Sequence, residues 1–115
     1  MMQKDDSLYL RHILDAISTI GEYLTDIDYE KFSRTQLLQD GVIRQFEIIG
    51  EATKNLSQDV RQISPKVPWK SMAGMRDKLI HQYFGVDIKA VWLTAQDDLP
   101  ELEKVIRQLL VDFEP

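Results

Sequence analysis

The chain has 115 residues, of which 43% are hydrophobic and 29% charged, and its formal net charge is −5. This balance predicts a single folded domain over residues 1–115 with a buried core, and it excludes a disordered chain. The sequence contains no cysteine, which excludes disulfides and thiolate metal sites. A polar start and the absence of a long apolar run predict a cytoplasmic protein without a signal peptide or membrane span.

Charge is distributed unevenly along the chain. Residues 61–89 hold six Lys/Arg and two Asp/Glu, a balance of +4. Residues 1–60 hold six and eleven, and residues 90–115 hold two and six, so both flanks are acidic. A locally positive segment can attract a polyanion although the whole chain is acidic.

Apolar residues recur at three and four positions in the first half of the chain, which predicts two helices. The first ends a few residues after Gly21, and its start offers three capping residues: Asp5, Asp6 and Ser7. Residues 25–28 are expected to form the exit loop. The second helix is expected from about Thr35 to Leu56.

The second half is punctuated by prolines. Residues 57–60 could start one short turn, but Pro65 and Pro68 prevent a continuous helix. Pro68 is expected to open a helix that begins with Trp69, ends near Tyr83 and is stopped by Gly85. Two further helices are expected from the pattern, the first capped by Asp87 and the second by Asp97 or Asp98. The predicted architecture is an all-α antiparallel bundle of about five helices.

The segment from Arg76 to Tyr83 concentrates the reactive side chains of the chain. Arg76 offers a planar fork that suits a phosphate, and His81 offers an imidazole whose ordinary pKa lies near neutrality. Both have structural alternatives, because Arg76 could be a surface arginine and His81 a cap at the end of its helix.

Helix geometry constrains how these residues can act together. Arg76 and Tyr83 lie within roughly 20° of one face, whereas Arg76 and His81 are about 140° apart on a straight helix. Arg76 and His81 therefore converge only if the helix unwinds near His81, if their side chains bend, or if a second copy of the chain completes the site.

A second constellation lies in the helix expected over residues 35–56. Glu47 and Glu51 are four residues apart, a spacing that paired carboxylates use in metal or acid–base sites. Arg44 precedes Glu47 by three residues, so an ion pair within the helix is the favoured interpretation. His12 is expected to be solvated, and two isolated histidines do not predict a structural zinc site.

The stretch Arg76-Asp77-Lys78-Leu79-Ile80-His81-Gln82-Tyr83 resembles the R-x-x-x-x-H-x-Y motif of HEPN-domain ribonuclease toxins of the HepT-like branch. The resemblance extends over nearly the whole chain, through five further segments: Ile48–Ala52, Val67–Trp69, Met72–Arg76, Tyr83–Asp87 and Val91–Pro100.

This resemblance implies an all-α homodimer that cleaves RNA without a metal or other cofactor, through attack of the 2′-hydroxyl on the neighbouring phosphate. It implies His81 as general acid–base, Arg76 as the group that stabilises phosphate charge, and Asp77 in support. Lys78 and Glu51 are possible supporting residues. The resemblance also implies a partner nucleotidyltransferase that neutralises the toxin by adding AMP to Tyr83.

Two other interpretations remain open on the sequence alone. The chain could be a non-catalytic helical subunit that binds nucleotide or RNA and docks a nucleotidyltransferase. It could also be a structural dimeric bundle in which Arg76 and His81 bond to Glu51 or Asp77.

Overall fold

The computed structural model of the chain describes residues 5–74 and 87–113, and every regular element in these two ranges is helical. The longer elements are α1 (Asp6–Tyr23), α3 (Gln36–Lys54) and α7 (Leu99–Phe113). The shorter ones are α2 (Tyr29–Arg34), α4 (Gln58–Ile63), α6 (Ile88–Leu93) and the π-helical turn η1 (Thr94–Asp98). Residues 69–74 are also helical. The predicted all-α bundle is confirmed.

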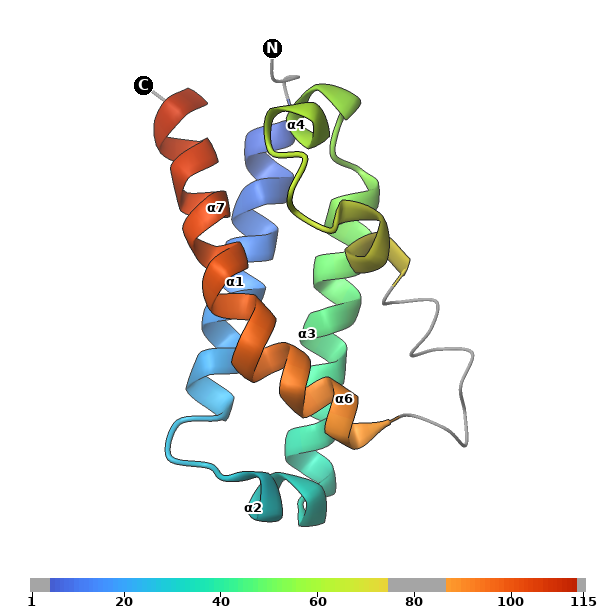
Figure 1. Cartoon of the computed structure of the whole chain (residues 1–115). Helices are drawn as coiled ribbons and strands as arrows, with labels where there is room; N and C mark the ends of the chain where they lie inside the picture. The colour runs from blue at the N-terminus through green and yellow to red at the C-terminus, as the bar shows by residue number, and fades with distance from the viewer. Residues whose placement is uncertain (1–4, 75–86, 114–115) are drawn as a thin grey trace.

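The bundle is built around an antiparallel pair, α1 and α3 (Figure 1). The continuous run of α6, η1 and α7 crosses this pair obliquely, and α7 packs against α1. Each long helix contributes the apolar stripe that its sequence pattern predicted, and side chains such as Ile13, Val42 and Ile106 are fully buried. This packing fixes the relative positions of the outward-facing polar residues.

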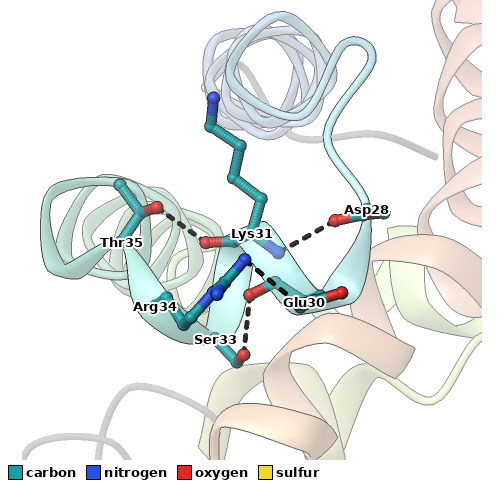
Figure 2. A network of polar contacts seen from close by, with 6 residues as sticks. All are labelled: Asp28, Glu30, Lys31, Ser33, Arg34 and Thr35. Atoms are coloured by element: carbon teal, nitrogen blue, oxygen red, sulfur yellow. Dashed lines mark hydrogen bonds and ion pairs between the residues drawn. The ribbon is translucent and has the colours of Figure 1, made fainter.

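Helix α2 was not predicted from the sequence, which assigned no structure between the exit loop and the second helix. Asp28 caps it, because a carboxylate oxygen of Asp28 accepts a hydrogen bond of 2.8 Å from the Lys31 backbone N–H (Figure 2). The side chain of Phe32 is fully buried, and this burial stabilises the short helix α2. The Gln39 side chain donates to the Phe32 carbonyl over 2.8 Å and ties α2 to α3.

The first turn of α1 is not capped in the way that the sequence predicted. Asp5 occupies the N-cap position but its side chain makes no capping hydrogen bond. Asp6 lies inside the helix with only 2% of its surface exposed. Its carboxylate accepts hydrogen bonds from the backbone N–H and hydroxyl of Ser57, at 2.9 and 2.6 Å. A long-range contact therefore replaces the local cap that the sequence predicted.

The break expected at Asp97 or Asp98 is absent, and this prediction was wrong. Residues 88–113 form one continuous helical run in which η1 provides a wider turn, and the Leu99 N–H donates to the Thr94 carbonyl five residues back. Pro100 explains the widening, because it has no N–H to donate to Gln96 and its ring would clash with that carbonyl in a regular α-helix. The run passes over the proline without a new cap.

Other boundaries agree with the sequence. Thr35 precedes α3 as expected, the short turn after Ser57 is α4, and Trp69 opens the helical residues 69–74. The Arg61 guanidinium donates to the Thr53 carbonyl near the end of α3 over 2.7 Å. Within residues 5–74 and 87–113, no helix is both long enough and apolar enough to cross a membrane.

Candidate functional site

The residues of the predicted reactive motif lie outside the described part of the chain. This applies to Arg76, Asp77, Lys78, His81 and Tyr83, which all fall within residues 75–86. Of the predicted site residues, only Glu51 is placed by the structure. The structure does place the elements on both sides of this segment and a groove that Glu51 lines.

The N-terminal side of the motif segment is anchored by Trp69. Its side chain is 5% exposed, and its indole N–H donates to the Ser64 carbonyl over 2.9 Å. The Met72 N–H donates to the Pro68 carbonyl over 3.0 Å, which starts the helical turn that Pro68 was expected to open. The buried tryptophan thus fixes the helical residues that lead into the motif.

The C-terminal side of the segment begins at Asp87, whose side chain accepts a hydrogen bond of 3.1 Å from the Ala90 N–H. This is the cap predicted from the sequence. Behind it, the Trp92 ring packs against the rings of Tyr29 and Phe32, with centroid distances of 5.9 and 5.4 Å. The Lys89 ammonium lies 4.0 Å from the centroid of the Tyr29 ring. An aromatic cluster therefore anchors this end to α2.

Glu51 lies in a polar groove between α1 and α3, here called the α1/α3 groove. Its volume is about 350 Å³, and it is lined by Tyr9, His12, Arg44, Glu47, Ile48, Glu51, Ala52 and Asn55. Tyr9 and His12 stand edge to face across 6.1 Å between ring centroids. The groove gathers an imidazole, a phenol, a guanidinium and two carboxylates in one hollow.

The Arg44–Glu47 ion pair predicted from their spacing is confirmed, with 3.4 Å between its closest nitrogen and oxygen. The Glu47 side chain is 24% exposed, whereas that of Arg44 is 68% exposed. The Asn55 amide donates to the Glu51 backbone carbonyl over 2.9 Å. These contacts hold the α3 side of the groove in place while the Arg44 guanidinium stays accessible.

His12 is exposed, as expected from its polar surroundings. The sequence nevertheless missed that it faces Glu47 and Glu51 across the α1/α3 groove. Tyr9 and His12 are three residues apart, and Glu47 and Glu51 are four apart, so each pair can be seen in the sequence. Nothing in the sequence showed that the helix faces that carry these two pairs meet. In the described ranges, no three His, Cys, Asp or Glu side chains are grouped as a metal site requires.

A second, largely apolar groove lies between residues 66–72 and the η1 turn. Its volume is about 500 Å³, and Phe46, Ile49 and Leu102 are among its apolar lining residues. Its charged lining residues are Lys66, Asp97, Asp98 and Glu101. The fold thus places three carboxylates beside a lysine of the basic 61–89 segment. The positive balance of that segment along the chain is not matched by an all-positive surface here.

The family model described as Ribonuclease HepT-like matches residues 13–109. "Probable ribonuclease HepT" of Thermococcus cleftensis is 44% identical over 108 residues, covering 94% of this chain and 98% of that protein. "Putative RNase MJ0125" of Methanocaldococcus jannaschii is 43% identical over 114 residues, covering 99% and 98%. "Putative RNase TTE0752" of Caldanaerobacter subterraneus is 46% identical over 102 residues, covering 89% and 91%.

A comparison with solved structures gave no match. The family match spans most of the helical bundle, and the relatives align over nearly their full lengths. An all-α bundle with the R-x-x-x-x-H-x-Y segment between Trp69 and Asp87 defines a HEPN-type helical domain. The chain belongs to the HepT-like ribonuclease family.

Proposed function

We propose that the chain is a cytoplasmic endoribonuclease toxin that cleaves RNA without a metal ion. The observation that carries this proposal is the complete R-x-x-x-x-H-x-Y sequence, Arg76 to Tyr83, in a chain that belongs to the HepT-like ribonuclease family. The relatives named as ribonucleases cover nearly the entire chain, which supports RNA as the substrate class. Residues 1–115 act as a single domain.

The proposed reaction is a transesterification followed by product release. The RNA 2′-hydroxyl attacks the neighbouring phosphorus and the bond to the 5′-oxygen breaks, which leaves a 2′,3′-cyclic phosphate and a free 5′-hydroxyl. His81 acts as general acid–base, which accepts or donates a proton during this step. Arg76 stabilises the charge that develops on the phosphate. Asp77 orients one of these two groups, and Lys78 and Glu51 support binding.

A homodimer resolves the geometric problem within this motif. Arg76 and His81 point about 140° apart on a straight helix, so one copy alone does not bring both to one phosphate without distortion. Two copies that face each other across a shared cleft supply Arg76 from one chain and His81 from the other. This arrangement supports the homodimer as the active form.

The proposed regulation acts through Tyr83. On a straight helix Tyr83 would lie within roughly 20° of the face that carries Arg76, so a nucleotide attached to its hydroxyl would block access to that arginine. The proposed partner is a small nucleotidyltransferase antitoxin that transfers AMP to Tyr83. The bulky, charged adduct would prevent RNA from reaching the cleft.

A non-catalytic role is the competing proposal. The three carboxylates that line the 500 Å³ groove, Asp97, Asp98 and Glu101, would repel RNA but suit a basic protein surface. In this case the chain would dock a nucleotidyltransferase and contribute binding of nucleotide or RNA without chemistry of its own.

Cleavage of defined RNA by the purified full-length chain in the presence of EDTA tests the ribonuclease proposal. The wild-type protein is expected to leave a cyclic phosphate end, and His81→Ala is expected to abolish cleavage with an unchanged circular dichroism spectrum. Lys104→Ala, an exposed residue on α7, serves as the control that keeps activity. Cleavage that survives His81→Ala would refute the mechanism, and an inert wild-type chain that binds the transferase would favour the alternative.

A further inference from the structure

The 500 Å³ groove combines an apolar floor with an acidic rim. Three parts of the chain supply its apolar lining: Phe46 and Ile49 on α3, Met72 in the helical residues 69–74, and Leu99, Leu102 and Val105 on α7. Asp97, Asp98 and Glu101 supply three exposed carboxylates on the side formed by η1 and α7. Lys66 is the one cation among the described lining residues. A complementary ligand is therefore apolar along its middle and positively charged along one edge.

The carboxylates of this rim are not paired with cations in the described part of the chain. Within residues 5–74 and 87–113, Asp97, Asp98 and Glu101 form no ion pair. Glu103 on the same helix does form one, with 3.1 Å between its carboxylate and the Arg107 guanidinium. Glu101 follows the two aspartates at four and three positions, so the three side chains lie on one side of the helical run. Neighbouring like charges repel, and a cationic partner would relieve that repulsion.

The length of the groove favours an elongated ligand. On one side its lining runs along the helical axis from Thr94 to Val105, a span of about 16 Å. This span equals about three turns of a second helix laid alongside. A volume of about 500 Å³ can take up the apolar side chains of such a helix while its backbone lies at the mouth. Proteins recognise amphipathic helices in this way, through apolar residues three and four positions apart.

A second copy of this chain is a poor match through its described long helices. Helices α1, α3 and α7 each hold three Asp/Glu, against one, two and two Lys/Arg. The acidic rim would repel each of them more than it attracts them. RNA is disfavoured by the same argument, because its backbone is anionic. The complementary occupant is therefore a different, positively charged chain.

We propose that the 500 Å³ groove docks a basic amphipathic helix of a partner protein. The apolar anchors of this helix pack on Phe46, Ile49 and Leu102. Lysine or arginine side chains along one flank of the helix pair with the three carboxylates of the rim. The site goes beyond the ribonuclease proposal, because docking requires neither RNA cleavage nor any residue from Arg76 to Tyr83.

Three synthetic peptides test the site in the full-length protein. The lysine peptide, of about 14 residues, has leucine at every third or fourth position, lysine on the flanks and alanine elsewhere. The second peptide has glutamate in place of each lysine, and the third has the composition of the first in an order without an apolar face. Fluorescence anisotropy is expected to show saturable binding of the lysine peptide, at least about tenfold tighter than binding of the others. Equal binding of all three, or none, would overturn the proposal.

The absence of cysteine allows the bound peptide to be located. Ser71 lines the groove, whereas Ser18 is an exposed residue of α1 outside it. Ser71→Cys and Ser18→Cys are each labelled with a polarity-sensitive dye. The lysine peptide is expected to shift the emission to shorter wavelength at position 71 and to leave it unchanged at position 18. An unchanged emission at position 71 would contradict the site, and a shift there caused by RNA but not by the peptide would assign the groove to RNA.

Removal of the three carboxylates is compared with the same charge change elsewhere. The rim variant carries three amides: Asp97→Asn, Asp98→Asn and Glu101→Gln. The control variant carries three amides at exposed residues outside the groove: Asp15→Asn, Glu22→Gln and Asp112→Asn. The rim variant is expected to bind the lysine peptide at least about tenfold more weakly, whereas the control variant keeps most of the binding. Equal weakening would show attraction to the acidic chain as a whole and would overturn the site.

Two further outcomes separate this site from other roles. Sedimentation that shows lost self-association in the rim variant, with peptide binding kept, would assign the groove to a second copy of the chain. If the lysine peptide binds in the groove but RNA stays intact, the ribonuclease proposal fails and the docking site stands. If RNA is cut but no peptide binds, the docking site alone fails.

Discussion

Asp6 and Ser57 are 51 positions apart in the chain, yet the Asp6 carboxylate accepts both the backbone N–H and the hydroxyl of Ser57. Ser57 also caps α4, because its side chain accepts a hydrogen bond from Val60 N–H over 3.4 Å. One buried carboxylate therefore joins the first turn of α1 to the start of α4. The contact positions the chain that continues toward Trp69 and the motif segment.

Asp6→Ala is expected to lower the free energy of unfolding by about 2–4 kcal/mol, because two hydrogen bonds to a charged group are lost and the Ser57 N–H is left without this acceptor. Urea unfolding monitored by circular dichroism measures the change. Asp5→Ala is the control, since Asp5 is exposed and makes no capping bond, and it is expected to change stability by less than about 0.5 kcal/mol. Equal losses in both variants would show that the long-range contact contributes nothing.

Gly21→Ala is expected to stabilise the protein by about 0.5–1 kcal/mol, because alanine has the higher helix propensity. An added Cβ at Gly21 meets no atom within 4 Å. At Gly41 the same atom would come within 3.0 Å of the Tyr23 ring, so Gly41→Ala should gain less or nothing. Thermal unfolding of both variants checks this, and an equal gain at both positions would contradict the crowding at Gly41.

Asp28→Ala is expected to lower the free energy of unfolding by about 1 kcal/mol, because the cap of α2 is lost and this helix holds the buried Phe32. Arg34→Gln breaks the Arg34–Glu30 ion pair in the same helix, in which both side chains are 72% exposed. The change should stay within about 0.5 kcal/mol, since exposed pairs contribute little. Urea unfolding of the two variants gives the comparison, and a larger loss in Arg34→Gln would reverse this ranking.

Arg76→Lys is expected to lower the single-turnover rate of RNA cleavage about 10²- to 10³-fold, because lysine keeps the charge but not the bidentate fork that would stabilise the phosphate. Binding of RNA to the same variant, measured with a substrate whose 2′-hydroxyl at the cleavage position is removed, should change much less. A rate close to that of the wild type would remove Arg76 from the proposed mechanism.

Co-expression with a candidate nucleotidyltransferase is expected to raise the intact mass by whole AMP increments and to suppress RNA cleavage. Tyr83→Phe should show neither effect, because phenylalanine lacks the hydroxyl that would accept the AMP. Tyr29→Phe serves as a control with another tyrosine removed and should still be modified. A mass increase that persists in Tyr83→Phe would place the modification elsewhere.

The long helices could be predicted from the sequence because each buries one regular apolar stripe. The boundary at Asp87 was also predictable, since the Asp87 side chain caps α6 locally. Helix α2 was not, because it is held by the burial of Phe32 and by a bond from Gln39, and neither contact follows from its own six residues. A new helix capped by Asp97 or Asp98 was predicted, whereas the helical run continues through the wider turn η1 and past Pro100.

One part of the candidate site could likewise be predicted from the sequence, and another part could not. The reactive motif was visible as a contiguous pattern and carries the family resemblance. The α1/α3 groove was not visible, because it depends on how far α1 and α3 are rotated toward each other. Neither the spacing of Tyr9 and His12 nor that of Glu47 and Glu51 specifies that rotation. The groove follows only when both buried stripes are packed in three dimensions.

The positions of the two tryptophans have a practical consequence. Trp69 and Trp92 are the only tryptophans of the chain, and each lies six residues outside the motif segment 75–86. Trp69 is buried, whereas Trp92 is partly exposed beside Tyr29 and Phe32. Their emission should therefore differ in wavelength and in access to quenchers. Single-tryptophan variants give the protein two unlabelled optical reporters, one on each side of the segment that the proposed chemistry requires.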